Sequence, residues 1–211
     1  MKRNNKLVSL FVTILVMLTS IALPSFYSVA AEPYSMTISV TNNTTGTKQT
    51  VDITPISQAV MALDDEATLI GEAYIKIPSN ELDPIEIMDA STYASSTTDT
   101  SSTQNTYWKA TVSVTYTDDG TYCTFSKAGA SWTQLRGTTT LSNREVYWGY
   151  TLGLKAGGKT EYPTSNSVSY NTGLGALKYG GGSLIGCNSS AMITLQSGST
   201  LKLEANIEKD F

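Results

Sequence analysis

The stretch from Tyr107 to Phe125 alternates regularly between apolar and polar residues. Its apolar positions share one face of an extended strand, and its Lys, Ser and Thr positions share the other face. The run Asp118-Asp119-Gly120 interrupts this alternation with residues that favour a tight turn. The stretch therefore predicts a β-hairpin that is buried on one side. The apolar positions before the turn are Trp108, Ala110, Val112, Val114 and Tyr116.

The register of this hairpin is constrained by burial, because a slip of one residue turns every side chain to the opposite face. A loop over residues 117–120 would pair Tyr116 with Thr121 and Val114 with Cys123. The same register would pair Val112 with Phe125. We expect this register, because it directs Cys123 towards the core.

Residues 1–31 have the organisation of a signal peptide. Lys2, Arg3 and Lys6 precede an uncharged, largely apolar run over residues 7–23, and small residues end at Ala31. We expect cleavage after Ala31, which would give a secreted protein without a stable membrane anchor. The alternative is an uncleaved anchor, because the apolar run is long enough to span a bilayer.

The composition excludes several classes of function. The chain of 211 residues contains no histidine and two cysteines, so imidazole catalysis and the common zinc sites are excluded. Removal of residues 1–31 leaves 11 basic residues against 18 acidic ones, a net charge of −7. An acidic chain without a basic stripe is a poor partner for nucleic acid. We expect no cofactor and no metal.

Further alternating segments extend the β pattern along the chain. Residues 36–41 and 49–54 predict a second hairpin, residues 67–77 a long strand, and residues 144–154 another strand with Leu154 on its apolar face. Thr54-Pro55 would allow a short helix over residues 56–63. About nine or ten short strands separated by turns predict an all-β fold, an antiparallel β-sandwich.

Residues 89–106 consist mainly of Ser, Thr, Asp, Ala and Asn. Such a segment buries too little apolar surface to offset the entropy of ordering it. It is a mobile loop within one domain or a linker between two modules. We favour a single β-sandwich domain over residues 32–211, because the part before the segment is short for an independent core.

The even cysteine count of an exported chain favours a disulfide between Cys123 and Cys187. This bridge would close a loop of about 60 residues and contribute about 4 kcal/mol. The alternative is a pair of reduced, buried thiols. The order Cys123, Trp132, Cys187 resembles that of an immunoglobulin domain, which implies an immunoglobulin-like sandwich. The chain departs from that pattern at Ile185, where such domains carry a tyrosine, and in its shorter spacing from Cys123 to Trp132.

Aromatic residues are the candidate ligand contacts. Exposed aromatic rings on a sheet can stack on sugar rings or pack against a partner, although most such rings simply pair across strands. Two acidic clusters, residues 64–66 and 118–119, lack the spacing of a calcium loop. The candidate contacts are Tyr107, Tyr122, Trp132 and Tyr147, with Tyr74 as a further aromatic residue of the same kind.

The sequence therefore predicts a secreted, non-catalytic β-sandwich that binds an extracellular protein or glycan, or has a structural role outside the cell. One alternative is a hydrolase that uses paired carboxylates on glycans. The other is a β-rich toxin or pore former, because long strands with one polar and one apolar face also occur in such proteins.

Overall fold

The computed structural model describes residues 34–54, 56–58, 66–79, 83–90, 92–93 and 105–211. These residues belong to one compact unit, Pro33–Phe211. The predicted signal peptide and most of the Ser/Thr-rich segment lie outside the described residues. No helix in the described part of the chain is long and apolar enough to cross a membrane.

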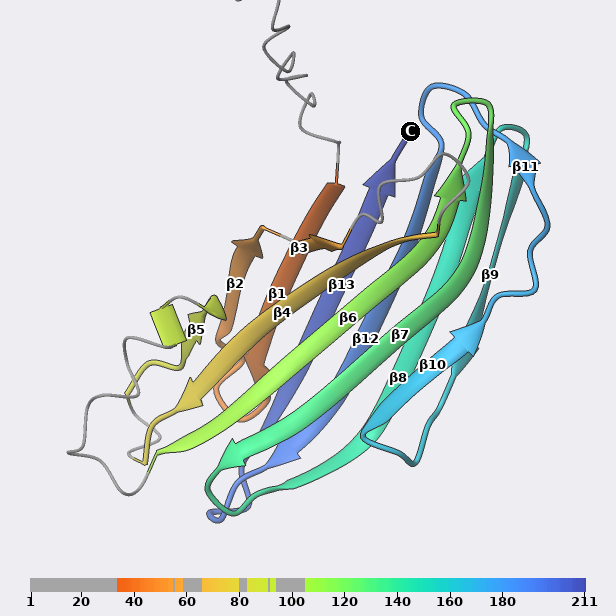
Figure 1. The fold of residues 1–211 in the computed structure, drawn as a ribbon. Coiled ribbons are helices and arrows are strands. Elements are labelled where there is room, and N and C mark those ends of the chain that lie inside the picture. The colour runs from red at the N-terminus through yellow and green to blue at the C-terminus, as the bar shows by residue number, and fades with distance from the viewer. Residues whose placement is uncertain (1–33, 55, 59–65, 80–82, 91, 94–104) are drawn as a thin grey trace, which may run out of the picture. The chain divides into compact units, whose positions relative to one another are not determined.

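The fold is all-β and consists of two antiparallel sheets, as expected for a β-sandwich (Figure 1). Sheet A has six strands in the order β2-β1-β13-β12-β8-β9. These strands are β1 (Tyr34–Asn42), β2 (Lys48–Ile53), β8 (Thr140–Leu152), β9 (Lys155–Glu161), β12 (Leu184–Thr194) and β13 (Thr200–Asp210).

Sheet B has seven strands, with the order β10-β7-β6-β4-β3, while β11 pairs with β7 and β5 pairs with β4. Its strands are β3 (Ile56–Gln58), β4 (Ala67–Ile77), β5 (Glu86–Met88), β6 (Thr106–Asp118), β7 (Tyr122–Arg136), β10 (Ser167–Asn171) and β11 (Leu177–Lys178). The described residues thus form more strands than the sequence predicts. The shortest, β3, β5 and β11, have two or three residues, so backbone pairing defines them and side-chain alternation cannot reveal them.

Two local sequence predictions are wrong. Ile56–Gln58 is strand β3, where a helix was expected, because its backbone pairs with Thr68–Ile70 of β4; residues 59–63 of that predicted helix lie outside the described residues. Leu154 lies in the turn after β8 and is fully exposed. The alternation that suggested a buried Leu154 ends two residues earlier, at Leu152.

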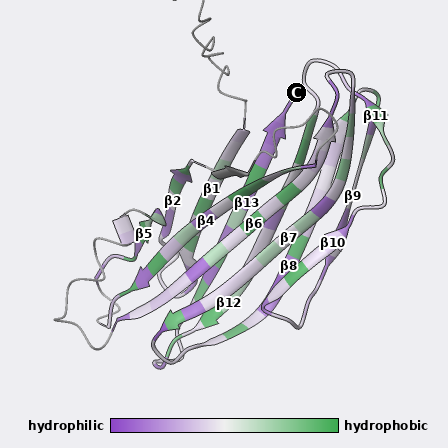
Figure 2. Ribbon diagram, in the orientation of Figure 1, coloured by the Kyte–Doolittle hydropathy of each residue, from purple (hydrophilic) through white to green (hydrophobic). Residues whose placement is uncertain are grey.

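The two inner faces form one hydrophobic core, and Figure 2 shows hydrophobic and hydrophilic residues alternating along its strands. The inner face of sheet B carries many small residues, among them Gly71, Ala73, Ala110 and Ala128. The space where Gly71 would carry a β-carbon is filled by Met36 from β1, whose Sδ lies 1.8 Å from that position.

The organising hairpin is β6–β7, but its register differs from the predicted one. Asp118 pairs with Cys123 and Tyr116 with Phe125, a shift of four residues along β7. The turn lies later in the chain because the Asp119 carboxylate accepts hydrogen bonds from the backbone amides of Thr121 and Tyr122, at 2.8 and 2.7 Å. A shift by an even number keeps the same face inward, so Cys123 is buried as predicted.

A β-bulge in β7 allows odd-numbered apolar residues before it and even-numbered apolar residues after it to face the core. Cys123 and Phe125 face the core before the bulge, and Ala128, Ala130 and Trp132 face it afterwards. Ser126 is the additional residue between them, and its hydroxyl donates a hydrogen bond of 3.0 Å to the Thr115 carbonyl. One inserted residue in a strand switches the side of every following side chain. The bulge therefore buries the apolar residues on both of its sides, from Cys123 to Trp132.

The expected disulfide is not present. Cys123 and Cys187 are free and buried, on β7 of sheet B and β12 of sheet A. The Cys187 Sγ lies 3.7 Å from the carbonyl oxygen of Gly129, which is six positions along β7 from Cys123, roughly 20 Å at strand spacing. A disulfide needs Cα atoms less than about 7 Å apart. Burial raises the pKa of both thiols to about 12, and Asp118 adds to this shift at Cys123.

We expect both thiols to resist modification in the folded protein, because they are buried and protonated. A thiol reagent should label two cysteines per chain after denaturation and none before it. A reductant should leave the melting temperature unchanged. If denatured, unreduced protein shows no reactive thiol, the two cysteines form a disulfide, which would contradict the structure.

Gly71→Ala should lower the free energy of unfolding by about 1–3 kcal/mol, because its new methyl group overlaps the buried Met36 side chain. Chemical denaturation measures this loss. Combining Gly71→Ala with Met36→Val, which removes the overlapping Sδ and Cε atoms, should cost less than the sum of the two single changes. Strict additivity would show that the two residues do not pack against each other.

Candidate functional site

Three glycines lie in register on the outer face of sheet A. Gly158 of β9 pairs with Gly149 of β8, which pairs with Gly186 of β12. The outer face follows from the strand alternation, because the neighbouring residues Trp148 and Cys187 point into the core. Without side chains, the three positions leave bare backbone across three adjacent strands.

The ring of Tyr147 occupies part of this bare strip. A β-carbon at Gly149 would lie 2.6 Å from the Tyr147 Oη, and one at Gly158 would lie at the same distance from it. Opposite ring edges, Cε1 and Cε2, approach the two glycines. The ring therefore lies along the sheet between the two missing β-carbons. The residue remains 45% exposed, so the outer face of the ring is open to solvent.

The strand positions beside Tyr147 carry polar side chains. Thr160 and Asn188 are the direct cross-strand partners of Tyr147, on β9 and β12. The next position in the same row is Asn206 of β13, whose amide donates a 3.0 Å hydrogen bond to Glu208. The combination of an open aromatic face with neighbouring amide, hydroxyl and carboxylate groups is suited to a polar ligand that also has an apolar face.

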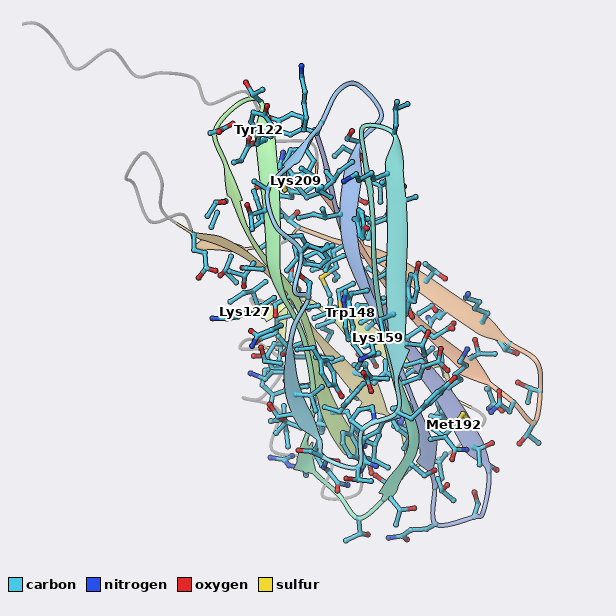
Figure 3. The ribbon with its side chains drawn as sticks, turned by 90° about the vertical axis from the view of Figure 1, so that its right-hand side faces the viewer. Tyr122, Lys127, Trp148, Lys159, Met192 and Lys209 are labelled. Carbon is cyan, nitrogen blue, oxygen red and sulfur yellow. The ribbon has the colours of Figure 1, made fainter. Side chains whose placement is uncertain are left out.

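The inner side of β8 is held in place beneath this ring. Trp148, which is 4% exposed, stacks on Tyr170 with a centroid separation of 5.1 Å. The Lys159 Nζ lies 6.0 Å from the centre of the Trp148 ring, and Figure 3 shows the two side chains together. These contacts join β8 and β9 to β10 of the other sheet. The strands that carry Tyr147, Gly149 and Gly158 are therefore packed on their inner side.

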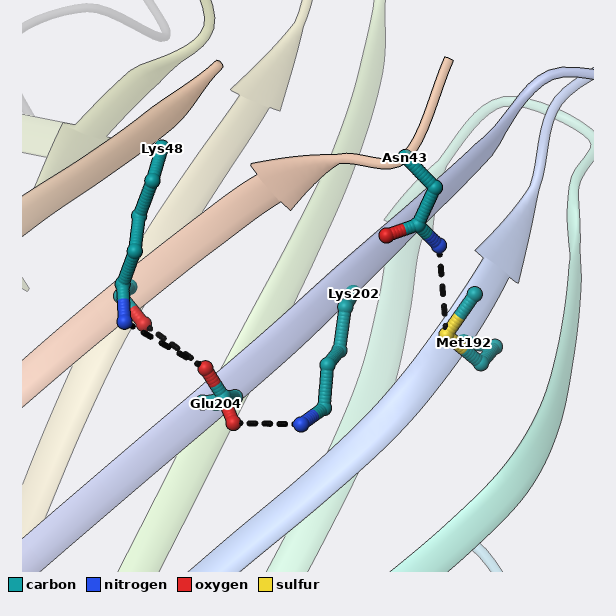
Figure 4. Close-up of polar contacts among 6 residues, drawn as sticks. Asn43, Lys48, Met192, Lys202 and Glu204 are labelled. Carbon is teal, nitrogen blue, oxygen red and sulfur yellow. Dashed lines mark hydrogen bonds and ion pairs between the residues drawn. The ribbon is translucent and has the colours of Figure 1, made fainter. Parts of the chain in front are cut away.

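A charged network continues the polar outer face of sheet A towards β2 (Figure 4). The Glu204 carboxylate lies 2.6 Å from the Lys202 Nζ and 3.6 Å from the Lys48 Nζ. The Ser39 hydroxyl also donates to it, at 3.3 Å. Burial by itself would raise the pKa of Glu204, but the hydrogen bond and charge of Lys202 and the charge of Lys48 outweigh it, so its pKa is lowered.

The other predicted aromatic contacts do not join Tyr147. Tyr122 is 46% exposed and lies at the tip of the β6–β7 hairpin, away from Trp148 in Figure 3. Tyr107 is 8% exposed at the opposite end of that hairpin, where it pairs with Arg136. Trp132 is only 1% exposed and belongs to the core, which corrects its expected outward position. The bulge at Ser126 directs it inward.

A second aromatic cluster lies on the outer face of sheet B. Tyr93 stacks on Tyr74 at a centroid distance of 4.1 Å and meets the ring of Tyr107 edge-on. The Tyr74 hydroxyl donates to Glu72, which also pairs with Lys109 at 3.0 Å. Burial, followed by the hydrogen bond to Glu72, raises the pKa of Tyr74 to about 12. These rings cover one another, so this cluster is a weaker candidate than the open ring of Tyr147.

The acidic cluster at residues 118–119 has a structural role. The Asp118 carboxylate accepts hydrogen bonds from the Gly120 amide at 2.8 Å and from the Tyr179 hydroxyl at 2.7 Å. Asp119 holds the same turn. Of the other cluster, residues 64 and 65 lie outside the described residues. Within the described ranges, no group of three or more Cys, Asp or Glu residues is placed to hold a metal ion.

The sequence analysis identified Tyr147 as a candidate contact but did not identify the glycines on which its ring lies. Gly149 could have been noticed as a glycine inside a strand, which often marks a close approach of another group. The alignment of Gly149 with Gly158 and Gly186 depends on two strand registers that the sequence does not show.

No protein-family model matches the chain, and comparison with curated proteins and with solved structures finds no match. The functional inference therefore depends on the site itself.

Glu204→Gln should reduce stability at neutral pH by about 0.5–1 kcal/mol, because it removes an ion-pair network at the surface. A lowered pKa contributes stability above the unfolded value near 4.5, and this contribution disappears as the pH falls through the folded pKa. Denaturation of both proteins between pH 7 and pH 3 should show the difference shrinking on acidification. Asp52→Asn, at an exposed carboxylate of β2, is the control, and an equal effect there would contradict a specific role for Glu204.

Proposed function

We propose that this chain is a secreted, non-catalytic module that binds a neutral glycan on the outer face of sheet A. The open ring face of Tyr147, held flat on the backbone of Gly149 and Gly158, is the observation that supports this proposal. The C–H groups on one side of a sugar ring carry slight positive charge. They are attracted to the negative face of an aromatic ring, and their apolar surface is removed from water there.

The groups around Tyr147 support a sugar over a purely apolar ligand. Asn188 and Thr160 are the cross-strand neighbours of Tyr147, and their side chains can exchange hydrogen bonds with hydroxyl groups of a ligand and so fix its orientation. Glu208 lies on the same outer face, on β13. Together with the acidic net charge of the chain, this carboxylate disfavours sulfated or uronic glycans through repulsion. We therefore propose an uncharged glycan.

The location outside the cell comes from the predicted signal peptide over residues 1–31. The immunoglobulin-like arrangement also stays a prediction. The alternative role of Tyr147 is structural, since an aromatic ring that covers a glycine on a neighbouring strand stabilises a sheet by itself. A binding experiment separates the two roles, because only the proposed one requires a ligand.

Tyr147→Ala should weaken glycan binding by about tenfold or more, which corresponds to the loss of one stacking contact of about 1.5 kcal/mol. A glycan array would identify ligands, and calorimetry would measure the affinity of the wild type and the variant for the best of them. Tyr122→Ala is the matched control, because Tyr122 is equally exposed but lies at a hairpin tip. Tyr147→Phe should retain most of the affinity.

Several outcomes would contradict the proposal. An array without any bound neutral glycan, or equal losses in Tyr147→Ala and Tyr122→Ala, would leave Tyr147 with its structural role. New reducing ends in the recovered glycan would indicate the hydrolase. Dye release from liposomes at low protein concentration would indicate the pore former.

A further inference from the structure

A cavity of about 370 Å³ opens between the two sheets, at the end that carries the β1–β2 and β12–β13 hairpins, and neither Tyr122 nor Tyr147 lines it. Its walls come from four segments: the β1–β2 hairpin, the end of β4, the residues leading into β5, and the β12–β13 hairpin. Both sheets therefore contribute to it. We refer to this cavity as the end pocket.

The lining of the end pocket is mostly apolar. Val40 and Leu201 of sheet A and Ile77 of sheet B line it and also belong to the core. Ile85 and Leu195 add further apolar surface. A pocket of a few hundred cubic ångströms with an apolar lining and a few polar groups is the usual form of a small-molecule site.

The polar groups of the end pocket are confined to two places. The β1–β2 hairpin contributes Thr45 and Thr47, whose hydroxyl groups lie 3.0 Å apart, together with Gln49. The residues leading into β5 contribute Asp83, the single charged side chain among the described residues that line the pocket. A negative charge beside apolar surface favours a ligand with a cationic end and disfavours an anionic one.

We propose that the end pocket binds a small molecule with an apolar ring or chain and a cationic end that faces Asp83. A cavity of about 150 Å³ accommodates benzene, so at the same density the end pocket holds about 15 non-hydrogen atoms. This site is independent of the glycan surface. The two can be tested separately, because none of the described residues that line the end pocket lies on the Tyr147 surface.

The test uses two probes that share a naphthalene ring, 1-naphthylmethylammonium and 1-naphthoate. Calorimetry on the full-length secreted chain should show one site for the ammonium, with a dissociation constant between micromolar and millimolar values. The naphthoate should bind at least about tenfold more weakly than the ammonium, because its carboxylate is repelled by Asp83. Asp83→Asn should bring the two affinities together, because it removes the charge that distinguishes the probes.

Gln49→Trp is a variant designed to block the pocket, and Thr50→Trp is its matched control. Gln49 is opposite the inward-facing Val40 and lines the end pocket, whereas Thr50 is opposite Ser39 and points to the other face of the same edge strand. Gln49→Trp should fill the pocket and abolish ammonium binding, and Thr50→Trp should leave it unchanged. Circular dichroism checks that both variants fold. Should Gln49→Trp fail to fold, the effect of Asp83→Asn decides the matter.

Four results would overturn this inference. The first three are no binding of the ammonium probe, equal binding of both probes to the wild type, and binding that survives Gln49→Trp in a folded protein. The fourth is loss of ammonium binding in Tyr147→Ala. Tyr147→Ala should leave ammonium binding intact. Its loss there would place the probe on the glycan surface, which would refute the end pocket while leaving the glycan proposal standing.

Discussion

The packing of the inner face of sheet A against the inner face of sheet B is the interaction on which the rest of the structure depends. Met36 fills the space at Gly71, and the alanines of β4, β6 and β7 allow the sheets to approach. Close-packed interiors tolerate little change in volume. Each strand must therefore present the correct face inward along its whole length.

This requirement explains the bulge in β7. The apolar residues of that strand change parity between Phe125 and Ala128, and without an extra residue one of the two sets would face solvent. Ser126 provides the extra residue, and as a result Trp132 is buried. The same requirement tolerates a shift of four residues in the hairpin register, because that shift leaves every side chain on its original side.

The outer face of sheet A is free of this constraint, and its composition differs accordingly. Three aligned glycines there do not contribute to the core, and the ring of Tyr147 lies between two of them with one face open. The charged pair Lys48–Glu204 and the amides of Asn188 and Asn206 keep the remainder of this face polar. The end pocket, by contrast, lies at one end of the two inner faces, where Val40 and Leu201 of the core line it.

The sequence by itself determined the all-β class, the inward faces of β4 and β6, the burial of Cys123 and the candidacy of Tyr147. Alternation with a period of two is a local property, so it can be read without knowing which strands are neighbours. Only the tertiary structure decided that Cys123 and Cys187 lie too far apart to bridge, that Trp132 is buried, and that Gly149, Gly158 and Gly186 share one row. These features depend on register, on a bulge and on the position of one sheet over the other. They are set by packing between residues far apart in the chain, which no local pattern records.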